Sequence, residues 1–116
     1  MSNQKTKTQK DQAVTSTSVA IEIVEATVDT QRARLEELIT LTHASGNQCK
    51  GLEKTLQTLQ DAKAEPEAIE VVQAEVDRLV GENTEQVQEY KRLQQEYQAN
   101  CKVLEKLKSK NESEDE

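Results

Sequence analysis

Apolar residues recur along two stretches of this chain at alternating steps of three and four, and a single proline separates the stretches. This spacing is the seam of a coiled coil, in which two positions of each seven-residue repeat face a neighbouring helix. The first ladder consists of Ile21, Val24, Val28, Gln31, Leu35, Leu38, Thr42, Ser45, Cys49, Leu52, Leu56 and Leu59. The second ladder consists of Ile69, Val72, Val76, Leu79, Asn83, Gln86, Tyr90, Leu93, Tyr97, Asn100, Leu104 and Leu107. Neither ladder slips in phase, so the pattern predicts two long coiled-coil helices.

The amino-acid composition limits what these helices can pack against. Apolar residues make up 34% of the chain, which has no Phe and no Trp. That content is low for a closed globular core but sufficient for a narrow seam. A seam on an isolated helix would remain in water, so the pattern predicts a hairpin, self-association or a partner.

The expected boundaries follow from the periodicity and from Pro66. We expect one coiled-coil domain over residues 18–108, with helices over 18–62 and 66–108 and a turn over 63–65. Pro66 suits the first position of a helix. Residues 1–17 and the acidic residues 109–116 lack the periodicity, which predicts disordered tails. Residues 43–47 resemble a loop locally, but the unbroken phase favours a continuous helix weakened by Gly46, at about 1 kcal/mol relative to Ala.

A hairpin that reverses near residue 63 pairs the two ladders in a definite register. It places Leu56 opposite Ile69, Cys49 opposite Val76, Leu35 opposite Tyr90 and Arg34 opposite Glu89. Thr42 falls opposite Asn83, and a polar pair within an apolar seam is a device that sets register. The alternative, one continuous helix in a parallel dimer, must hold Pro66 in its interior at a cost of about 3 kcal/mol. We therefore favour an all-α fold, a long antiparallel two-helix coiled-coil hairpin.

One flank of the predicted hairpin carries apolar residues outside the seam. Ile39, Val80 and Val87 lie on this flank, and Cys101 continues it further along, while Leu41 lies on the opposite flank near Glu82. Exposed apolar stripes usually mark interfaces. The candidates for partner binding are Ile39, Leu41, Val80 and Val87, which would dock further helices and complete a three- or four-helix bundle. The alternative is a seam that is merely wider within the chain.

Residues that could act in catalysis or bind a metal or a cofactor are scarce. His43 is the only histidine, and no carboxylate or thiol stands at motif spacing from it. Cys49 and Cys101 have no CxxC spacing and no nearby histidine, which indicates reduced thiols rather than a zinc site. No Gly-rich phosphate loop is present. We expect no enzyme, no cofactor, no metal and no small-molecule substrate.

The net charge and the lack of long apolar runs limit which classes of partner we expect. The formal net charge is −7, which disfavours binding to the phosphates of nucleic acid. No apolar run reaches the length of a membrane span, and no signal-peptide core follows Met1, which favours a cytoplasmic protein without membrane insertion, with the nucleus as the alternative. Ser113 is followed by three acidic residues and is a candidate phosphorylation site.

A short segment of the second ladder resembles a known family. Residues 92–103, RLQQEYQANCKV, resemble the C-terminal helix of the smallest coiled-coil subunits of the intraflagellar transport machinery. The resemblance covers about a tenth of the chain, and the rest of that family's pattern is absent. The function of that family is therefore not carried over.

These observations favour a non-catalytic structural or adaptor subunit of a larger intracellular assembly, such as a vesicle- or organelle-tethering, kinetochore or microtubule-associated complex. Its expected partners are other coiled-coil proteins in a hetero-oligomeric complex, with a homo-oligomer as the alternative. The alternative function is a prefoldin-like hairpin chaperone that holds unfolded clients. Exposed apolar residues at the free helix ends would favour the chaperone.

Overall fold

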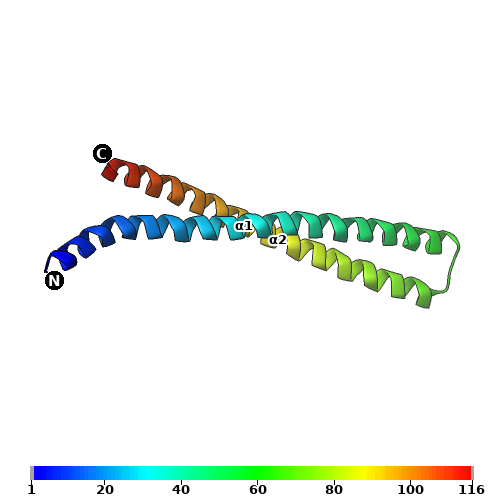
Figure 1. Ribbon diagram of the computed structural model, residues 1–116. Coiled ribbons are helices and arrows are strands. Elements are labelled where there is room, and N and C mark those ends of the chain that lie inside the picture. The colour runs from blue at the N-terminus through cyan, green and yellow to red at the C-terminus, as the bar shows by residue number, and fades with distance from the viewer. Residues whose placement is uncertain (1, 116) are drawn as a thin grey trace. The chain divides into compact units, whose positions relative to one another are not determined.

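The protein folds as two long helices, α1 (Ser2–Asp61) and α2 (Pro66–Asp115), joined by a short turn (Figure 1). The computed structural model describes the backbone of residues 2–115 and the side chains of residues 17–112. No strand occurs in this described backbone. The helices run antiparallel and contact each other through their seams, which confirms the predicted all-α coiled-coil hairpin.

Both helices extend beyond the predicted ranges. α1 begins at Ser2 rather than at residue 18, and α2 continues to Asp115 rather than ending at residue 108. Residues 2–17 and 109–115 contain neither Gly nor Pro, so nothing in them interrupts the helical hydrogen bonds. The disorder expected for 1–17 and 109–116 stays a prediction. The side chain of Ser113 lies outside the described residues.

The loop-like residues 43–47 are helical, as the unbroken heptad phase predicts. Gly46 lies inside α1 with an ordinary backbone conformation, since none of the described glycines has a positive φ angle. A Cβ atom added to Gly46 would lie 3.7 Å from the Asn83 side-chain nitrogen, which is normal van der Waals contact. The glycine weakens the helix without breaking it.

The interhelical contacts form two units. Unit 2 consists of Arg34–Leu93, and unit 1 takes in the described residues up to Ala33 and from Gln94 onward. In each unit every seam residue is buried or half-buried. The most buried apolar seam residues of unit 2 are Leu35, Leu38, Cys49, Val76 and Leu79, and that of unit 1 is Val28. In unit 2, Cys49 belongs to one core cluster with Val76 and Leu79, which agrees with the predicted register at this level.

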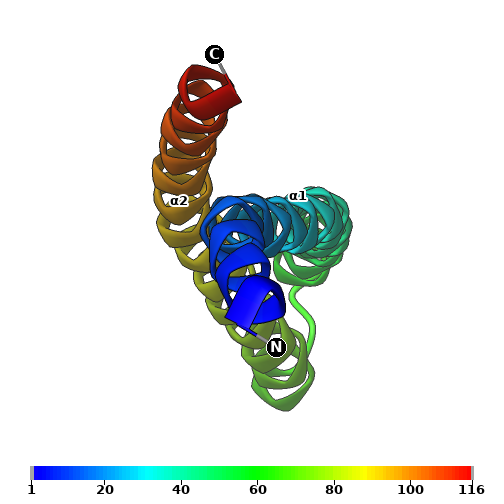
Figure 2. The ribbon, with the colours of Figure 1, turned by 60° about the vertical axis from the view of Figure 1, so that its left-hand side comes forward.

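A short turn connects the end of α1 to the start of α2 (Figure 2), and α1 ends there in a Schellman motif. The N–H of Ala64 donates to the Leu59 carbonyl at 2.9 Å, and the N–H of Lys63 donates to the Gln60 carbonyl at 3.1 Å. Lys63 adopts the left-handed conformation that this motif requires, with φ at 54°. The motif satisfies two carbonyls at the end of α1 and reverses the chain, although glycine is the residue usually found at this position.

Pro66 explains where α2 begins. The Glu65 carbonyl accepts hydrogen bonds from the N–H groups of Ala68 at 3.0 Å and Ile69 at 3.2 Å, so Glu65 caps the helix. Pro66 is then the first helical residue, where its missing N–H leaves no hydrogen bond unmade. Glu67 lies in the first turn, where a negative charge interacts favourably with the helix dipole.

Candidate interaction edges of the hairpin

A network of polar side chains occupies the middle of the unit 2 seam. The Asn83 side-chain amide donates to the Thr42 backbone carbonyl at 3.0 Å and to the Ser45 hydroxyl at 2.9 Å. Ser45 donates in turn to the Gln86 side-chain oxygen at 2.8 Å. Ser45 is buried, with 4% of its surface exposed. The predicted pairing of Thr42 with Asn83 therefore occurs, and two further seam residues complete it.

The network favours one register of the seam. A shift of one heptad would place Asn83 opposite Leu35 or Cys49, and the Ser45 hydroxyl that accepts one of its N–H donors would be replaced by Leu38 or Leu52. Leaving buried donors unpaired costs about 1–3 kcal/mol, so the observed pairing is favoured over the shifted ones. The role of Thr42 and Asn83 in setting register stays a prediction. Ser45 and Gln86 were not among the predicted site residues. Ser45 lies at the seam position after Thr42, and Gln86 lies at the seam position after Asn83.

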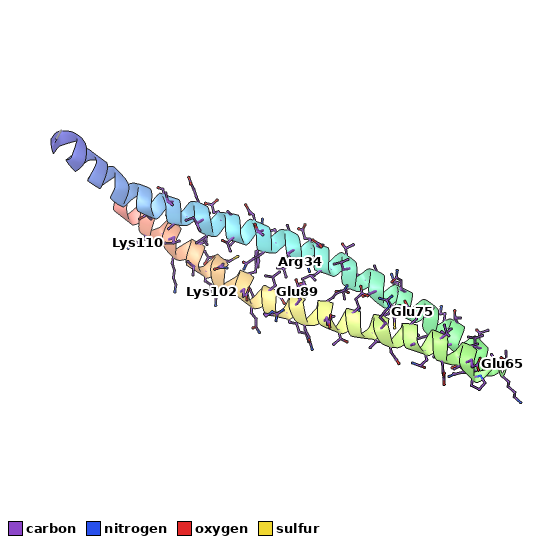
Figure 3. The ribbon with its side chains drawn as sticks, turned by 90° about the horizontal axis from the view of Figure 1, so that it is seen from below. Arg34, Glu65, Glu75, Glu89, Lys102 and Lys110 are labelled. Atoms are coloured by element: carbon purple, nitrogen blue, oxygen red, sulfur yellow. The ribbon has the colours of Figure 1, made fainter. Side chains whose placement is uncertain are left out.

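One edge of unit 2, which we call the charged edge, carries an interhelical ion pair. The Arg34 guanidinium donates to both carboxylate oxygens of Glu89, at 2.7 and 3.0 Å, and also to Glu37 at 2.7 Å. Figure 3 shows Arg34 on α1 and Glu89 on α2 facing each other. The hydrogen bond from Arg34 lowers the pKa of the Glu89 carboxyl below its ordinary value. The predicted facing of Arg34 and Glu89 is confirmed.

The same edge continues with a second set of charges on α2. Arg78 pairs with Glu75 and with Glu82, the latter at 3.1 Å, and the hydrogen bond from Arg78 lowers the pKa of Glu75. Leu41 follows Arg34 by one heptad, so it lies on this edge, with 37% of its surface exposed. A shallow depression of about 420 Å³ on this edge is lined by Gln48, Gly51, Leu52, Glu75, Arg78 and Leu79.

The opposite edge of unit 2 has no ion pair among the described residues, and we call its uncharged stretch, which ends before Glu53 on α1, the apolar edge. It consists of Ile39 and Gly46 on α1 with Val80 and Val87 on α2, which occupy equivalent heptad positions. Ile39 is 44% exposed and Val80 is 45% exposed, whereas Val87 is half-buried. Three of the four predicted partner-binding residues thus share one edge, and Leu41 lies on the other. The partner-binding role of all four stays a prediction.

Further exposed apolar residues lie outside these edges. Val71 in unit 2 is 72% exposed. Unit 1 exposes Val19, Ile23 and Val103 to 41%, 61% and 44%. The sequence interpretation did not include these residues, because it followed the seam and one flank. A survey of every apolar residue outside the two ladders would have found them.

Unit 1 has polar interhelical contacts of its own. The Asn100 side-chain amide donates to the Gln31 side-chain oxygen at 3.1 Å, within the seam. Arg32 donates to the Tyr97 hydroxyl at 3.2 Å, and its guanidinium lies 5.9 Å from the centre of the Tyr97 ring. At this distance the cation interacts favourably with the ring face. These contacts link α1 to α2 within unit 1.

The thiols show no arrangement for reactivity. Cys49 is 9% exposed, and burial raises the pKa of its thiol, with a further contribution from its hydrogen bond to Glu53 at 3.5 Å. A raised pKa reduces the fraction of reactive thiolate. Cys101 is half-buried, and both cysteines are free. Among the described residues, no group of three His, Cys, Asp or Glu side chains could hold a metal ion.

Two further results bear on the class of protein. Neither α1 nor α2, over the described residues, is long and apolar enough to cross a membrane. Comparison with protein-family models, with curated proteins and with solved structures gives no match.

Proposed function

We propose that this chain is a non-catalytic structural or adaptor subunit of a larger intracellular protein assembly, which it joins by docking partner helices on the apolar edge. The observation that carries this proposal is the exposure of Ile39 and Val80 on one edge beside a continuous buried seam. Apolar side chains in this position gain free energy when another helix covers them. The partners would be other coiled-coil proteins, with further copies of this chain as the alternative. The proposed location is the cytoplasm, with the nucleus as the alternative.

The hairpin is suited to this role because its own seam is already satisfied. The described side chains leave no buried nitrogen or oxygen without a hydrogen-bond partner. A partner helix on the apolar edge would therefore add to a complete structure rather than repair an incomplete one. Two helices bury one seam, and one or two further helices on the edge would produce a three- or four-helix bundle.

The test compares two valine substitutions on the same helix. Val80→Glu places a carboxylate on the apolar edge, and Val71→Glu makes the same chemical change at a position that is 72% exposed elsewhere on α2. Burying an unpaired carboxylate costs several kcal/mol, and each 1.4 kcal/mol lowers affinity about tenfold. Proteins that co-purify and crosslink with the wild-type chain in cell extract should be lost from Val80→Glu and retained by Val71→Glu.

Circular dichroism of both variants separates docking from folding. Each variant should keep the helicity of the wild type, because neither residue belongs to the seam. Retention of all partners by Val80→Glu would contradict the proposal. A loss of helicity in Val80→Glu alone would instead show that the apolar edge belongs to the chain's own core.

A chaperone that holds unfolded clients is the second candidate function, and one observation favours it. Val19, Ile23 and Val103 are exposed in unit 1, which contains the first part of α1 and the last part of α2. A holdase would suppress the aggregation of a chemically denatured test protein, and Ile23→Glu with Val103→Glu would abolish that activity while Val80→Glu would not. If no suppression occurs at equimolar chain, the chaperone function is excluded.

A further inference from the structure

Charged residues border the apolar edge, and their signs indicate which kind of molecule could cover it. Next to Ile39, Gly46, Val80 and Val87, on the side away from the seam, lies a row of exposed residues on each helix. The α1 row consists of Glu36, His43 and Lys50, and the α2 row consists of Asp77, Thr84 and Lys91. Each row thus begins with a carboxylate and ends, two heptads later, with an ammonium group.

The register of the hairpin places opposite charges at the same end of the edge. Cys49 and Val76 belong to one core cluster, and the next residues along the two helices are Lys50 and Asp77. Arg34 pairs with Glu89, and two residues further along each helix lie Glu36 and Lys91. At 1.5 Å per residue, the members of each pair lie within about one helical turn of each other along the hairpin.

These four charges have no opposite charge as a partner within the described chain. Glu36, Lys50, Asp77 and Lys91 make no ion pair among the described residues, whereas Arg34 and Arg78 on the charged edge do. Asp77 accepts only a hydrogen bond from Gln73, at 2.9 Å, on its own helix. Their carboxylates and ammonium groups therefore remain available to charges on another molecule.

We propose that the apolar edge of unit 2 packs against the same edge of a second copy of this chain, so that two hairpins form a four-helix bundle. This inference rests on the proposed function and names the occupant of its docking edge, since one further copy supplies two helices at once. A two-fold axis along the hairpins brings α1 over α2 of the second copy, which sets Glu36 near Lys91 and Lys50 near Asp77. A two-fold axis across the hairpins brings α1 over α1, which sets Glu36 near Lys50 and Asp77 near Lys91.

The border is thus complementary to itself in both symmetric arrangements. In each of them the four border charges of one copy meet border charges of the opposite sign on the other copy, which gives four pairs around the apolar side chains. Such an arrangement, apolar in the centre and charged at the rim, is typical of protein interfaces. A partner helix with charges of one sign would instead meet a repulsive group at one end of each row.

The test uses two matched charge variants that do not depend on which axis applies. Glu36→Lys with Asp77→Lys makes all four border charges positive, and Lys50→Glu with Lys91→Glu makes all four negative. We expect the wild type to have about twice the 13.0 kDa mass of the chain in sedimentation or light scattering at about 0.1 mM. Each variant alone should self-associate at least about tenfold more weakly, and an equimolar mixture of the two should restore the dimer.

The outcomes separate this inference from the proposed function. A monomeric wild type, or variants that dimerise as well as the wild type, would overturn the second copy as occupant. A monomeric wild type together with loss of co-purifying proteins from Val80→Glu would assign the edge to another protein, which keeps the proposed function and overturns this inference. Circular dichroism of the charge variants should match the wild type, because all four residues are exposed and outside the seam. Failure of the mixture to dimerise, when both variants are helical, would also overturn the inference.

Discussion

Asn83 uses both hydrogens of its side-chain amide in the seam, donating one to the Thr42 carbonyl at 3.0 Å and the other to the Ser45 hydroxyl at 2.9 Å. A polar residue at a seam position normally reduces stability and selects one pairing of helices. The complete pairing of this amide limits the cost at the observed register. A shift of one heptad would replace the Ser45 hydroxyl by the side chain of Leu38 or Leu52.

Replacement of Asn83 by Leu should raise stability and relax specificity. The change adds apolar surface to the seam, and Ser45 keeps its hydrogen bond to Gln86. We expect a higher melting temperature by circular dichroism, together with a change of oligomeric state or a mixture of registers. A lower melting temperature with unchanged assembly would contradict the role of Asn83 in setting register.

Cysteines at Thr42 and Asn83 should crosslink within one chain. The hairpin brings these seam residues together across the helices, and a disulfide needs Cα atoms about 4.4–6.8 Å apart. The experiment requires a background in which Cys49 and Cys101 are replaced. A control with cysteines at Thr42 and Thr84 moves the second thiol to an exposed position outside the seam and should oxidise more slowly. Electrophoresis that showed only intermolecular dimers for the first pair would be incompatible with the hairpin.

Replacement of Lys63 by Gly should stabilise the turn. Lys63 holds the left-handed conformation at φ 54°, which costs a residue with a Cβ about 1–2 kcal/mol. Glycine adopts this conformation without that penalty, although it also increases the entropy of the unfolded chain. We expect Lys63→Gly to unfold at a higher urea concentration, by an amount equivalent to about 1 kcal/mol. Lys63→Val should shift the midpoint the other way, and equal midpoints for the two variants would disprove this account of the turn.

The ion pair of Arg34 and Glu89 should make stability depend on pH in a predictable direction. Because the pKa of Glu89 is lowered in the folded chain, the pair stabilises the fold above the unfolded value of about 4.3. This contribution is lost as the pH falls through the lower folded value. Glu89→Gln should therefore melt below the wild type at pH 7, and the difference should shrink below about pH 4.

A matched variant controls for the change in net charge. Glu96→Gln removes the same charge one heptad later, at a residue without an ion pair among the described side chains. It should leave the melting temperature nearly unchanged across the same pH range. Since Arg34 and Glu89 are 38% and 35% exposed, added salt should reduce the difference between wild type and Glu89→Gln. A difference that is constant with pH would rule out this pair as its source.

Much of the fold was predictable because the heptad phase assigns each residue a side of its helix. All residues of both ladders are buried or half-buried, including the polar ones at Gln31 and Asn100. The register was also predictable, since Pro66 fixes where the second helix starts and leaves only a short turn. The extent of the helices was not predictable. Residues 2–17 lack a seam, but they also contain no residue that stops a helix.

The candidate site was predictable only in part. The heptad positions of Ile39, Val80 and Val87 place them on one edge, and the structure adds that Val87 is more covered than the other two. The network through Ser45 and Gln86 depends on side-chain rotamers, which respond to the facing helix and leave no separate signal in the sequence. The same is true of Arg34, which reaches Glu37 and Glu89 together.

By itself, the sequence determined that two helices pair in an antiparallel seam, because a period of seven and one proline leave few other ways to cover the apolar residues. Only the tertiary structure decided how each polar group within that seam is satisfied and how far each apolar side chain beside it stays exposed. It also decided that Lys63, rather than a glycine, takes the left-handed position in the turn. These outcomes depend on contacts between residues distant in the chain, whereas the heptad pattern depends on neighbours within one helix.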